Sequence, residues 1–209
     1  RHVVDGRMLV EQALARGDRI LLEGQLGTMR DLDWGVYPYV TSSSPIAGGA
    51  SVGAGLPAVA IDRVLGIAKA YSTAVGAGPL PTELTDDVGE RLRERGAEYG
   101  ASTGRPRRCG WYDAVTVRYS AQLAGYSSIA LTKLDVLDGF ATIPVCVGYR
   151  APDGQELDTI PASDELFARL EPVYEELAGW QTDTTACRSW DGMSSGVMRV
   201  RSVAVPPRA

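Results

Sequence analysis

The sequence predicts an α/β protein with a mixed, largely parallel sheet and flanking helices, and two observations lead to this fold class. Short apolar runs of strand length alternate along the 209 residues with charged or amphipathic segments of helix length. The hydrophobic fraction of 44% is ordinary for a globular chain that buries a sizeable core. Strands that alternate with helices are typical of a largely parallel sheet with helices on its faces.

The N-terminal part is predicted to contain one helix, one strand and long loops. Residues 5–16 carry spaced apolar side chains and predict a helix. Residues 19–23 form a short apolar run before a glycine, which predicts a buried strand. Residues 24–57 are rich in Gly, Ser, Pro and aromatic side chains. This stretch is too long for an idle connection, so we expect functional loops.

The middle of the chain is predicted to hold a strand and two helices. Residues 64–73 indicate a strand with a helical lead-in. Residues 86–95 are strongly charged and predict a helix, for which Gly96 is the expected C-cap. Residues 113–123 predict a second helix, with Asp113 near its N-cap.

Two further strands and a short helix are predicted toward the C-terminus. Residues 129–132 and 143–149 are apolar runs of strand length. Residues 152–154 have the turn sequence Pro-Asp-Gly. A helix is expected to begin within residues 163–170, so the alternation of elements continues to this point.

Composition excludes several function classes. The net charge of -5 argues against a general nucleic-acid or membrane-surface binder. The three cysteines have no CxxC spacing, and an odd number without a framework favours a reducing, cytoplasmic compartment. No apolar run approaches the roughly 20 residues that span a bilayer. We therefore expect a cytoplasmic protein without nucleic-acid or membrane partners.

A Lys-x-Asp element follows the predicted strand 129–132. Ligands of α/β sheets bind at the carboxyl ends of strands. The Asp135 carboxylate could accept two hydrogen bonds from a guanine edge, a donor pair that adenine lacks. The stem of Lys133 could lie over the base while its ammonium stays in water. The alternative is a strand end with a capping Asp, and the short element alone does not exclude it.

A second candidate is the loop of residues 100–108, which combines small residues, hydroxyls and arginines. Small residues let backbone N–H groups approach an anion, and arginine matches carboxylate or phosphate bidentately. Arg105, Arg107 and Arg108 would repel one another unless an anion lay among them. The alternative is a solvated basic turn. No Gly-Lys-Ser/Thr of a Walker A motif occurs in the sequence.

A third candidate joins residues 24–28 to residues 37–43. Their amides and hydroxyls would suit a phosphate or a purine edge, although ordinary loop chemistry explains them equally well. Asp31 and Asp33 lie between the two runs and are expected to cap a turn. No carboxylate pair has a diagnostic acid–base spacing, and no metal-ligand cluster occurs, so no catalytic residue and no metal ligand is predicted.

Taken in order, these motifs resemble the adenylosuccinate synthetase family. The resemblance extends from about Leu21 to about Trp190, and several long motifs with matching spacing make a chance match very improbable. The runs that carry it are residues 23–28, 31–35, 37–43, 66–73, 75–83, 100–108, 110–111 and 131–139.

The resemblance implies a fold, a reaction and partners. The fold would be part of the P-loop-NTPase-like synthetase fold. The reaction would join IMP and L-aspartate into adenylosuccinate at the expense of GTP, through a 6-phosphoryl-IMP intermediate and with Mg²⁺. The intact family member would be a cytoplasmic homodimer. Its Mg²⁺ ligands are expected in an N-terminal segment that the 209 residues do not contain.

The family's site residues carry over to matching positions. Thr41 would contact the IMP phosphate, Arg105 would lie near both IMP and aspartate, and Arg107 would face GTP. The full sets implied are Gln25, Thr41, Val75 and Arg105 for IMP; Ala101, Ser102, Thr103, Gly104 and Arg105 for aspartate; and Arg107, Lys133, Leu134 and Asp135 for GTP.

The sequence departs from the family pattern in four places. The Gly-Asp-Glu-Gly-Lys-Gly loop with the catalytic Asp, and the catalytic His after it, do not occur. Leu26 stands where the family has the IMP-contacting Gln, and Ala74 where it usually has Arg. Residues 191–209 match nothing expected. We therefore expect residues 1–190 to form a partial domain of the C-terminal half and residues 191–209 to be a divergent, poorly ordered tail.

Three functional hypotheses stay open from the sequence. The leading one is a synthetase fragment that binds substrates and is inactive alone. The second is a non-enzymatic remnant that binds nucleotide or dimerises. The third is an unrelated GTP-binding module, which leaves residues 37–43 and 75–83 unexplained.

Overall fold

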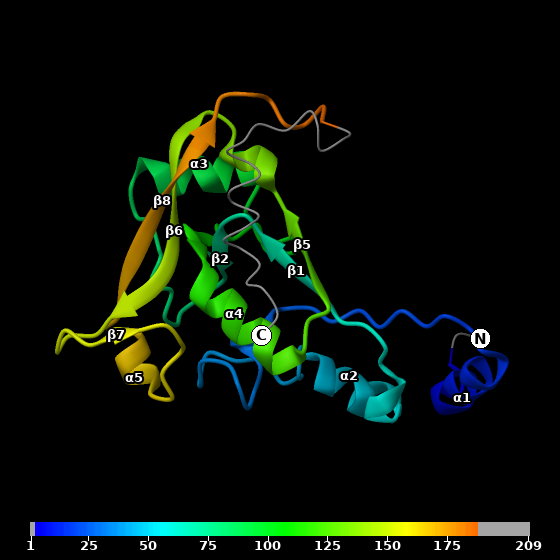
Figure 1. Ribbon diagram of the computed structural model, residues 1–209. Helices are drawn as coiled ribbons and strands as arrows, with labels where there is room; N and C mark the ends of the chain where they lie inside the picture. The colour runs from blue at the N-terminus through cyan, green and yellow to red at the C-terminus, as the bar shows by residue number, and fades with distance from the viewer. Residues whose placement is uncertain (1–2, 188–209) are drawn as a thin grey trace. The chain divides into compact units, whose positions relative to one another are not determined.

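The computed structural model describes residues 3–187, and the chain divides into two compact units (Figure 1). The first unit contains Arg1–Leu65 and Gln122–Ser128. The second contains Gly66–Ala121 and Ile129–Ala209. The predicted tail, residues 191–209, lies outside the described residues. No helix among residues 3–187 combines the length and the apolarity needed to cross a bilayer.

The first unit is made of short helices and loops. Helix α1, Gly6–Arg16, confirms the predicted helix. The carboxylate of its N-cap, Asp5, accepts from the Met8 N–H at 3.0 Å, and Gly17 ends the helix in the left-handed conformation, φ 72°. The remaining elements of this unit are η1 (Thr28–Arg30), α2 (Ala47–Ala54) and η2 (Ala58–Ala60).

The prediction of a strand at residues 19–23 is wrong. No strand of the described chain pairs with this run, and Leu21 is 91% exposed. An apolar run becomes a strand only where another backbone satisfies its N–H and C=O groups. Here the run pairs with no strand of the described chain, so its apolar pattern was not sufficient to identify a strand.

The second unit contains three groups of strands. β1, Leu65–Lys69, pairs with β5, Ser128–Thr132, which confirms both predicted strands. The predicted region 64–73 continues into β2, Ser72–Ala74, which pairs antiparallel with β3, Arg108–Gly110. The two small sheets therefore bring the end of the arginine loop beside the segment that follows β1.

The largest sheet is centred on β6, Phe140–Arg150, which contains the predicted strand 143–149 (Figure 1). β4, Tyr112–Asp113, pairs with it in parallel. β8, Glu171–Trp180, runs antiparallel to it along most of its length, and β7, Glu156–Leu157, forms a short hairpin. The mixed α/β class is thus confirmed, with its most extensive pairing antiparallel.

Helix α3, Asp87–Gly96, begins and ends close to the predicted positions. The Asp86 carboxylate accepts from two backbone N–H groups and caps its start. The predicted C-cap is wrong by one residue, because Ala97 adopts the left-handed conformation (φ 51°) and Gly96 is still helical. A Cβ at Gly96 would collide with the Tyr71 hydroxyl, so glycine is needed there for space.

The other helices follow the predicted pattern. α4, Ala114–Ala124, is capped by the Asp113 carboxylate, which accepts from the N–H groups of Val115 and Thr116 at 3.0 Å. η3, Leu134–Leu137, directly follows the predicted guanine-binding lysine. α5, Asp164–Phe167, is shorter than the helix expected within residues 163–170.

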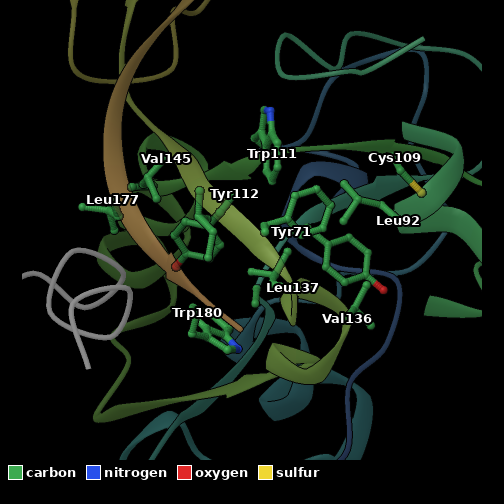
Figure 2. Packing of buried hydrophobic residues seen from close by; sticks show 14 residues of the cluster. Tyr71, Leu92, Cys109, Trp111, Tyr112, Val136, Leu137, Val145, Leu177 and Trp180 are labelled. Atoms are coloured by element: carbon green, nitrogen blue, oxygen red, sulfur yellow. The ribbon is translucent and has the colours of Figure 1, made fainter. Parts of the chain in front are cut away.

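The hydrophobic core of the second unit gathers side chains from α3, α4 and η3 and from the strands β3, β4, β6 and β8. Trp111 and Phe140 meet edge to face with ring centroids 5.5 Å apart. This core supports the segments that carry the candidate site residues. Its labelled members in Figure 2 are Tyr71, Leu92, Cys109, Trp111, Tyr112, Val136, Leu137, Val145, Leu177 and Trp180.

Candidate functional site

The Lys-x-Asp element lies where the sequence predicts it, directly after β5. Lys133 takes the left-handed conformation, φ 63°, and turns the chain into η3. Its side chain is exposed, whereas Leu134 and Asp135 are half-buried. The structure therefore places all three predicted GTP-binding residues of this element at one strand end.

Hydrogen bonds from α3 fix the backbone of this turn. Arg95 donates to the carbonyl of Asp135 at 3.1 Å and to the carbonyl of Asp138. Lys133 Nζ donates to the Gly96 carbonyl at 2.8 Å. Among residues 3–187, no hydrogen bond uses the Asp135 carboxylate. The turn is thus rigid in its backbone and keeps this carboxylate available to a ligand.

Asp138 anchors the same turn from its other end. Its buried carboxylate accepts from Trp180 Nε1 at 2.5 Å. It also accepts from the backbone N–H and the hydroxyl of Thr184, at 2.8 and 2.9 Å. The two aspartates therefore have different environments. The Asp138 carboxylate is hydrogen-bonded within the protein, whereas the Asp135 carboxylate has no hydrogen bond within residues 3–187.

The predicted aspartate-binding residues lie together at the tip of one loop. An isolated bridge between Tyr99 and Pro106 closes the loop, and the Gly100 N–H donates to the Arg105 carbonyl at 2.8 Å. Gly104 has φ 64°, a conformation that favours glycine. The residues from 101 to 105 are exposed. The Gly104 N–H donates to the Gly100 carbonyl at 2.8 Å and the Arg105 N–H donates to the Thr103 hydroxyl at 3.4 Å, so these two N–H groups stabilise the loop itself.

The three clustered arginines point to different partners. Arg107 is paired with Glu98, Nη1 to Oε2 at 2.7 Å, and Arg108 is paired with Glu83 at 2.8 and 2.5 Å. Arg105 has no ion pair within residues 3–187. Carboxylates of the chain itself therefore compensate two of the arginines, and Arg105 is the cation that the loop presents to an incoming anion.

Glu98 is a buried charged residue beside the arginine loop that the sequence analysis did not assign to a site. Its carboxylate is 1% exposed and accepts from Lys69 Nζ at 2.7 Å, Tyr71 Oη at 2.6 Å and Arg107 Nη1 at 2.7 Å. Burial by itself would raise the pKa of Glu98, but the hydrogen bonds from Lys69, Tyr71 and Arg107 hold this pKa below its ordinary value. Burial and the neighbouring Glu98 carboxylate raise the pKa of Tyr71. A glutamate next to an arginine-rich loop was the available signal.

The predicted IMP-binding residue Val75 follows β2 and is 49% exposed. Arg108 holds the loop after it, because its guanidinium donates to the carbonyls of Gly76 and Gly78 at 3.2 and 2.7 Å. The pairing of β2 with β3 brings Ala74 opposite Arg108. Val75 and the aspartate loop thus flank the same pair of short strands.

The other two predicted IMP-binding residues belong to the first unit. Gln25 is exposed, and the neighbouring Leu26 has φ 76° with 58% exposure. The Thr41 N–H donates to the Arg30 carbonyl at 2.8 Å, and Arg30 donates to the Tyr39 carbonyl at 2.6 Å. Thr41 is therefore held on η1, within the loop predicted to be functional.

Asp31 confirms the predicted turn cap in this loop. It is fully buried, and one carboxylate oxygen accepts from the N–H groups of Asp33 and Trp34 at 3.0 Å each. The other oxygen accepts from the Ser44 hydroxyl at 2.5 Å. The Asp31 side chain thus shapes the loop that carries Thr41.

No group of three His, Cys, Asp or Glu side chains in the described part of the chain is arranged to hold a metal ion. These residues do not fit the Mg²⁺ that the resemblance implies, so we derive no step through a metal.

Comparison with known proteins decides the family. The sequence model of adenylosuccinate synthetase matches residues 1–200. The chain belongs to the adenylosuccinate synthetase family. Two relatives of that name, from Trichlorobacter lovleyi and Gloeobacter violaceus, are 54% identical over 191 residues and 55% identical over 188 residues. The matches cover 91% and 90% of this chain but 44% and 42% of those proteins, so the chain spans less than half of their length.

Solved structures of this family have the same fold. The fully ligated adenylosuccinate synthetase from Plasmodium falciparum matches with a TM-score of 0.92 and 38% identity, over 97% of this chain and 49% of that one. A cyanophage S-2L succinoaminodeoxyadenylate synthetase, described as bound to dGMP and dATP as an energy donor, matches with a TM-score of 0.53 and 25% identity. That match covers 64% of this chain and 41% of the phage chain.

Proposed function

We propose that this chain supplies substrate-binding residues for the GTP-dependent ligation of IMP and L-aspartate to adenylosuccinate. The observation that carries the proposal is the family match over residues 1–200. The exposed loop tip at 101–105 and the accessible Asp135 carboxylate support it, because each presents the chemistry that one substrate requires. The reaction would proceed through 6-phosphoryl-IMP, whose phosphate the aspartate amine displaces.

The aspartate loop would bind the two substrate carboxylates. Ser102 and Thr103 offer hydroxyl and backbone N–H donors, and the Gly104 turn lets the chain approach closely. The guanidinium of Arg105 can donate two parallel hydrogen bonds to one carboxylate. Ala101 completes the proposed set with its backbone N–H group, and Gly104 shapes the turn, because its own N–H donates to the Gly100 carbonyl at 2.8 Å. Binding by several charge-assisted donors would orient the amine toward C6 of IMP.

The proposed nucleoside triphosphate site combines the turn after β5 with Arg107. Asp135 would accept from the guanine ring N–H and exocyclic amine, and Lys133 and Leu134 would contact the base. The phage synthetase of similar fold is described with dATP as its energy donor, so the fold alone does not decide the base. Since adenine lacks the two donors that Asp135 requires, we propose GTP for this chain.

Gln25, Thr41, Val75 and Arg105 are the proposed contacts to IMP. We further propose a cytoplasmic homodimer.

The 209 residues alone are proposed to be inactive, because no residue among them is assigned to deprotonate IMP. The test is adenylosuccinate formation by the purified chain with IMP, GTP and aspartate, compared with the chain expressed together with any sequence that flanks it in its gene. We expect product only from the latter. Turnover by the 209 residues would refute the inactivity, and no turnover by either protein would refute the proposed reaction.

The second candidate is a non-enzymatic nucleotide-binding or dimerising remnant. Binding of a fluorescent GTP analogue by both proteins, without product from either, would favour it. Sedimentation of both proteins with and without IMP tests the proposed dimer.

A further inference from the structure

Glu98 joins the last turn of α3 to the arginine loop, and it contacts the chain on both sides of that loop. We infer that Glu98 is a positioning residue, which holds the guanidinium of Arg107 for the nucleoside triphosphate and closes the base of residues 99–106. The inference rests on the proposed function of Arg107. Glu98 itself touches no substrate in this assignment.

Glu98 holds Arg107 at two points. Its carbonyl accepts from the Arg107 N–H at 2.9 Å, and its carboxylate Oε2 accepts from Arg107 Nη1 at 2.7 Å. Arg93 Nε donates to the Arg107 carbonyl at 2.8 Å, which fixes the backbone from the other side. With its main chain and one guanidinium nitrogen both fixed, Arg107 retains little rotational freedom.

The carboxylate that performs this role is itself held in place. Its other oxygen, Oε1, accepts from Lys69 Nζ and Tyr71 Oη at 2.7 and 2.6 Å. Tyr71 is 2% exposed in the core, and Lys69 donates a further hydrogen bond to the Thr73 hydroxyl at 2.8 Å. Partners on both oxygens prevent rotation of the carboxylate, so its geometry is set before any ligand binds.

The charge balance of the cluster favours an anionic ligand. Two cations, Lys69 and Arg107, share the single negative charge of Glu98, and the next cation, Arg93, is paired with Glu90. One positive charge is therefore left over. The side chains of Lys69 and Arg107 are 28% and 30% exposed, so a phosphate could reach this charge. If Glu98 only stabilised the fold, a single cation would be enough to balance its charge.

The same helix end also contacts the proposed guanine-binding turn. Gly96, packed on the Tyr71 hydroxyl, accepts a hydrogen bond from Lys133 through its carbonyl. Hydrogen bonds and packing therefore connect Arg107, Glu98, Tyr71, Gly96 and Lys133. This connection would keep a fixed spacing between the groups proposed to bind the phosphates and the base.

The decisive variant is Glu98→Gln, with Lys69→Met as its matched control. An amide has one acceptor oxygen, and Lys69 and Tyr71 together provide two donors for it. An amide oxygen that faces Lys69, which can only donate, and Tyr71 satisfies both groups; the NH₂ group then faces Arg107, so two donors meet and Arg107 is released. Lys69→Met removes the other cation but leaves the carboxylate bonded to Tyr71 and Arg107. Glu98→Gln abolishes both ion pairs of Glu98 and releases Arg107, whereas Lys69→Met abolishes one of them and keeps Arg107 held.

The first readout is the Nε–H signal of Arg107 in an NMR spectrum, assigned by its loss in Arg107→Lys. Nε is buried and has no hydrogen-bond partner among residues 3–187, so burial alone should slow the exchange of its proton in the parent and in Lys69→Met. The signal should be lost or exchange rapidly in Glu98→Gln. An unchanged signal in Glu98→Gln would overturn the inference whatever the enzyme assay shows. If this variant does not fold, Glu98→Asp, which shortens the reach by one methylene, takes its place with the same expected result.

The second readout is steady-state kinetics in the protein with its flanking sequence. Glu98→Gln should raise the KM for GTP roughly tenfold, the effect of losing one hydrogen bond to a charged group, with the KM for aspartate little changed. Lys69→Met removes a charge but leaves Arg107 in place, so it should raise the KM for GTP less than Glu98→Gln does. A released Arg107 with an unchanged KM for GTP would also overturn the inference. A parent protein without GTP-dependent activity would instead refute the proposed function, and the NMR readout would still decide whether Glu98 holds Arg107.

Discussion

Asp135→Asn should transfer the nucleotide preference from guanine to xanthine. The carboxylate of Asp135 can accept from both the ring N–H and the exocyclic amine of guanine, whereas an amide accepts only with its oxygen. Its NH₂ group would face the guanine amine, donor to donor, but it could donate to the 2-oxo group of xanthine. The variant should therefore bind GTP less tightly than the parent and xanthosine triphosphate more tightly.

The magnitude follows from the environment of the side chain. A hydrogen bond to a charged acceptor contributes about 1.5–3 kcal/mol, which corresponds to roughly a 10- to 150-fold rise in the KM for GTP. Arg95 holds the carbonyl of Asp135, and within residues 3–187 the carboxylate has no hydrogen bond to lose. The change of one atom should therefore leave the melting temperature nearly unchanged.

The assay compares the KM values for GTP and xanthosine triphosphate in the parent and the variant, with Asp138→Asn as the control. Asp138 lies three residues further along the same turn, where its carboxylate accepts from Trp180 and Thr184. That control should lower the melting temperature without changing the base preference. If Asp135→Asn keeps the parent's preference for GTP, or if the control changes it, Asp135 does not bind the base.

Three further predictions follow from the described contacts. Arg105→Leu should raise the KM for aspartate by the equivalent of about 2–5 kcal/mol and leave the melting temperature nearly unchanged, because the loop tip is exposed; a stability loss with normal aspartate use would contradict its assignment. Tyr149→Phe removes the buried hydrogen bond to Asp113 (2.6 Å) and should lower the free energy of unfolding by about 1.5–3 kcal/mol in denaturant titrations, whereas no change would show that this bond is not stabilising. The folded-state pKa of Glu98 lies below its unfolded value of about 4.3, so the stability that the Glu98 carboxylate contributes is present above that pH and is lost as the pH falls through the folded pKa. The melting temperature of Glu98→Gln should therefore fall less on acidification than that of the parent. Equal falls in melting temperature would contradict the lowered pKa.

Local chemistry made much of the fold predictable. Asp86 and Asp113 each precede a helical segment, and a carboxylate at that position satisfies N–H groups that have no partner within the helix. The turn after β5 was found in the same way, because a polar Lys-x-Asp element follows an apolar run. In each case the residues that determine the feature are close together in the sequence.

Features that depend on distant partners were not predictable. The run at 19–23 has the apolar pattern of a strand, but pairing requires another backbone, which the pattern does not reveal. Likewise, Glu98 contacts Lys69 and Tyr71, which lie 29 and 27 residues earlier. The sequence shows three arginines in one loop but not which of them a carboxylate will pair with. That choice is made by the tertiary fold, and it leaves only Arg105 at the loop tip.

The anchoring of Asp138 has a consequence for the order in which the protein matures on the ribosome. Its carboxylate is buried, yet all three of its donors come from Trp180 and Thr184, more than forty positions later in synthesis. Until that stretch has emerged and β8 has joined β6, the turn carries a negative charge that cannot be buried without cost. The proposed base-binding turn therefore cannot reach its final form early in translation, and a nascent chain that ends before Thr184 should not hold the nucleotide.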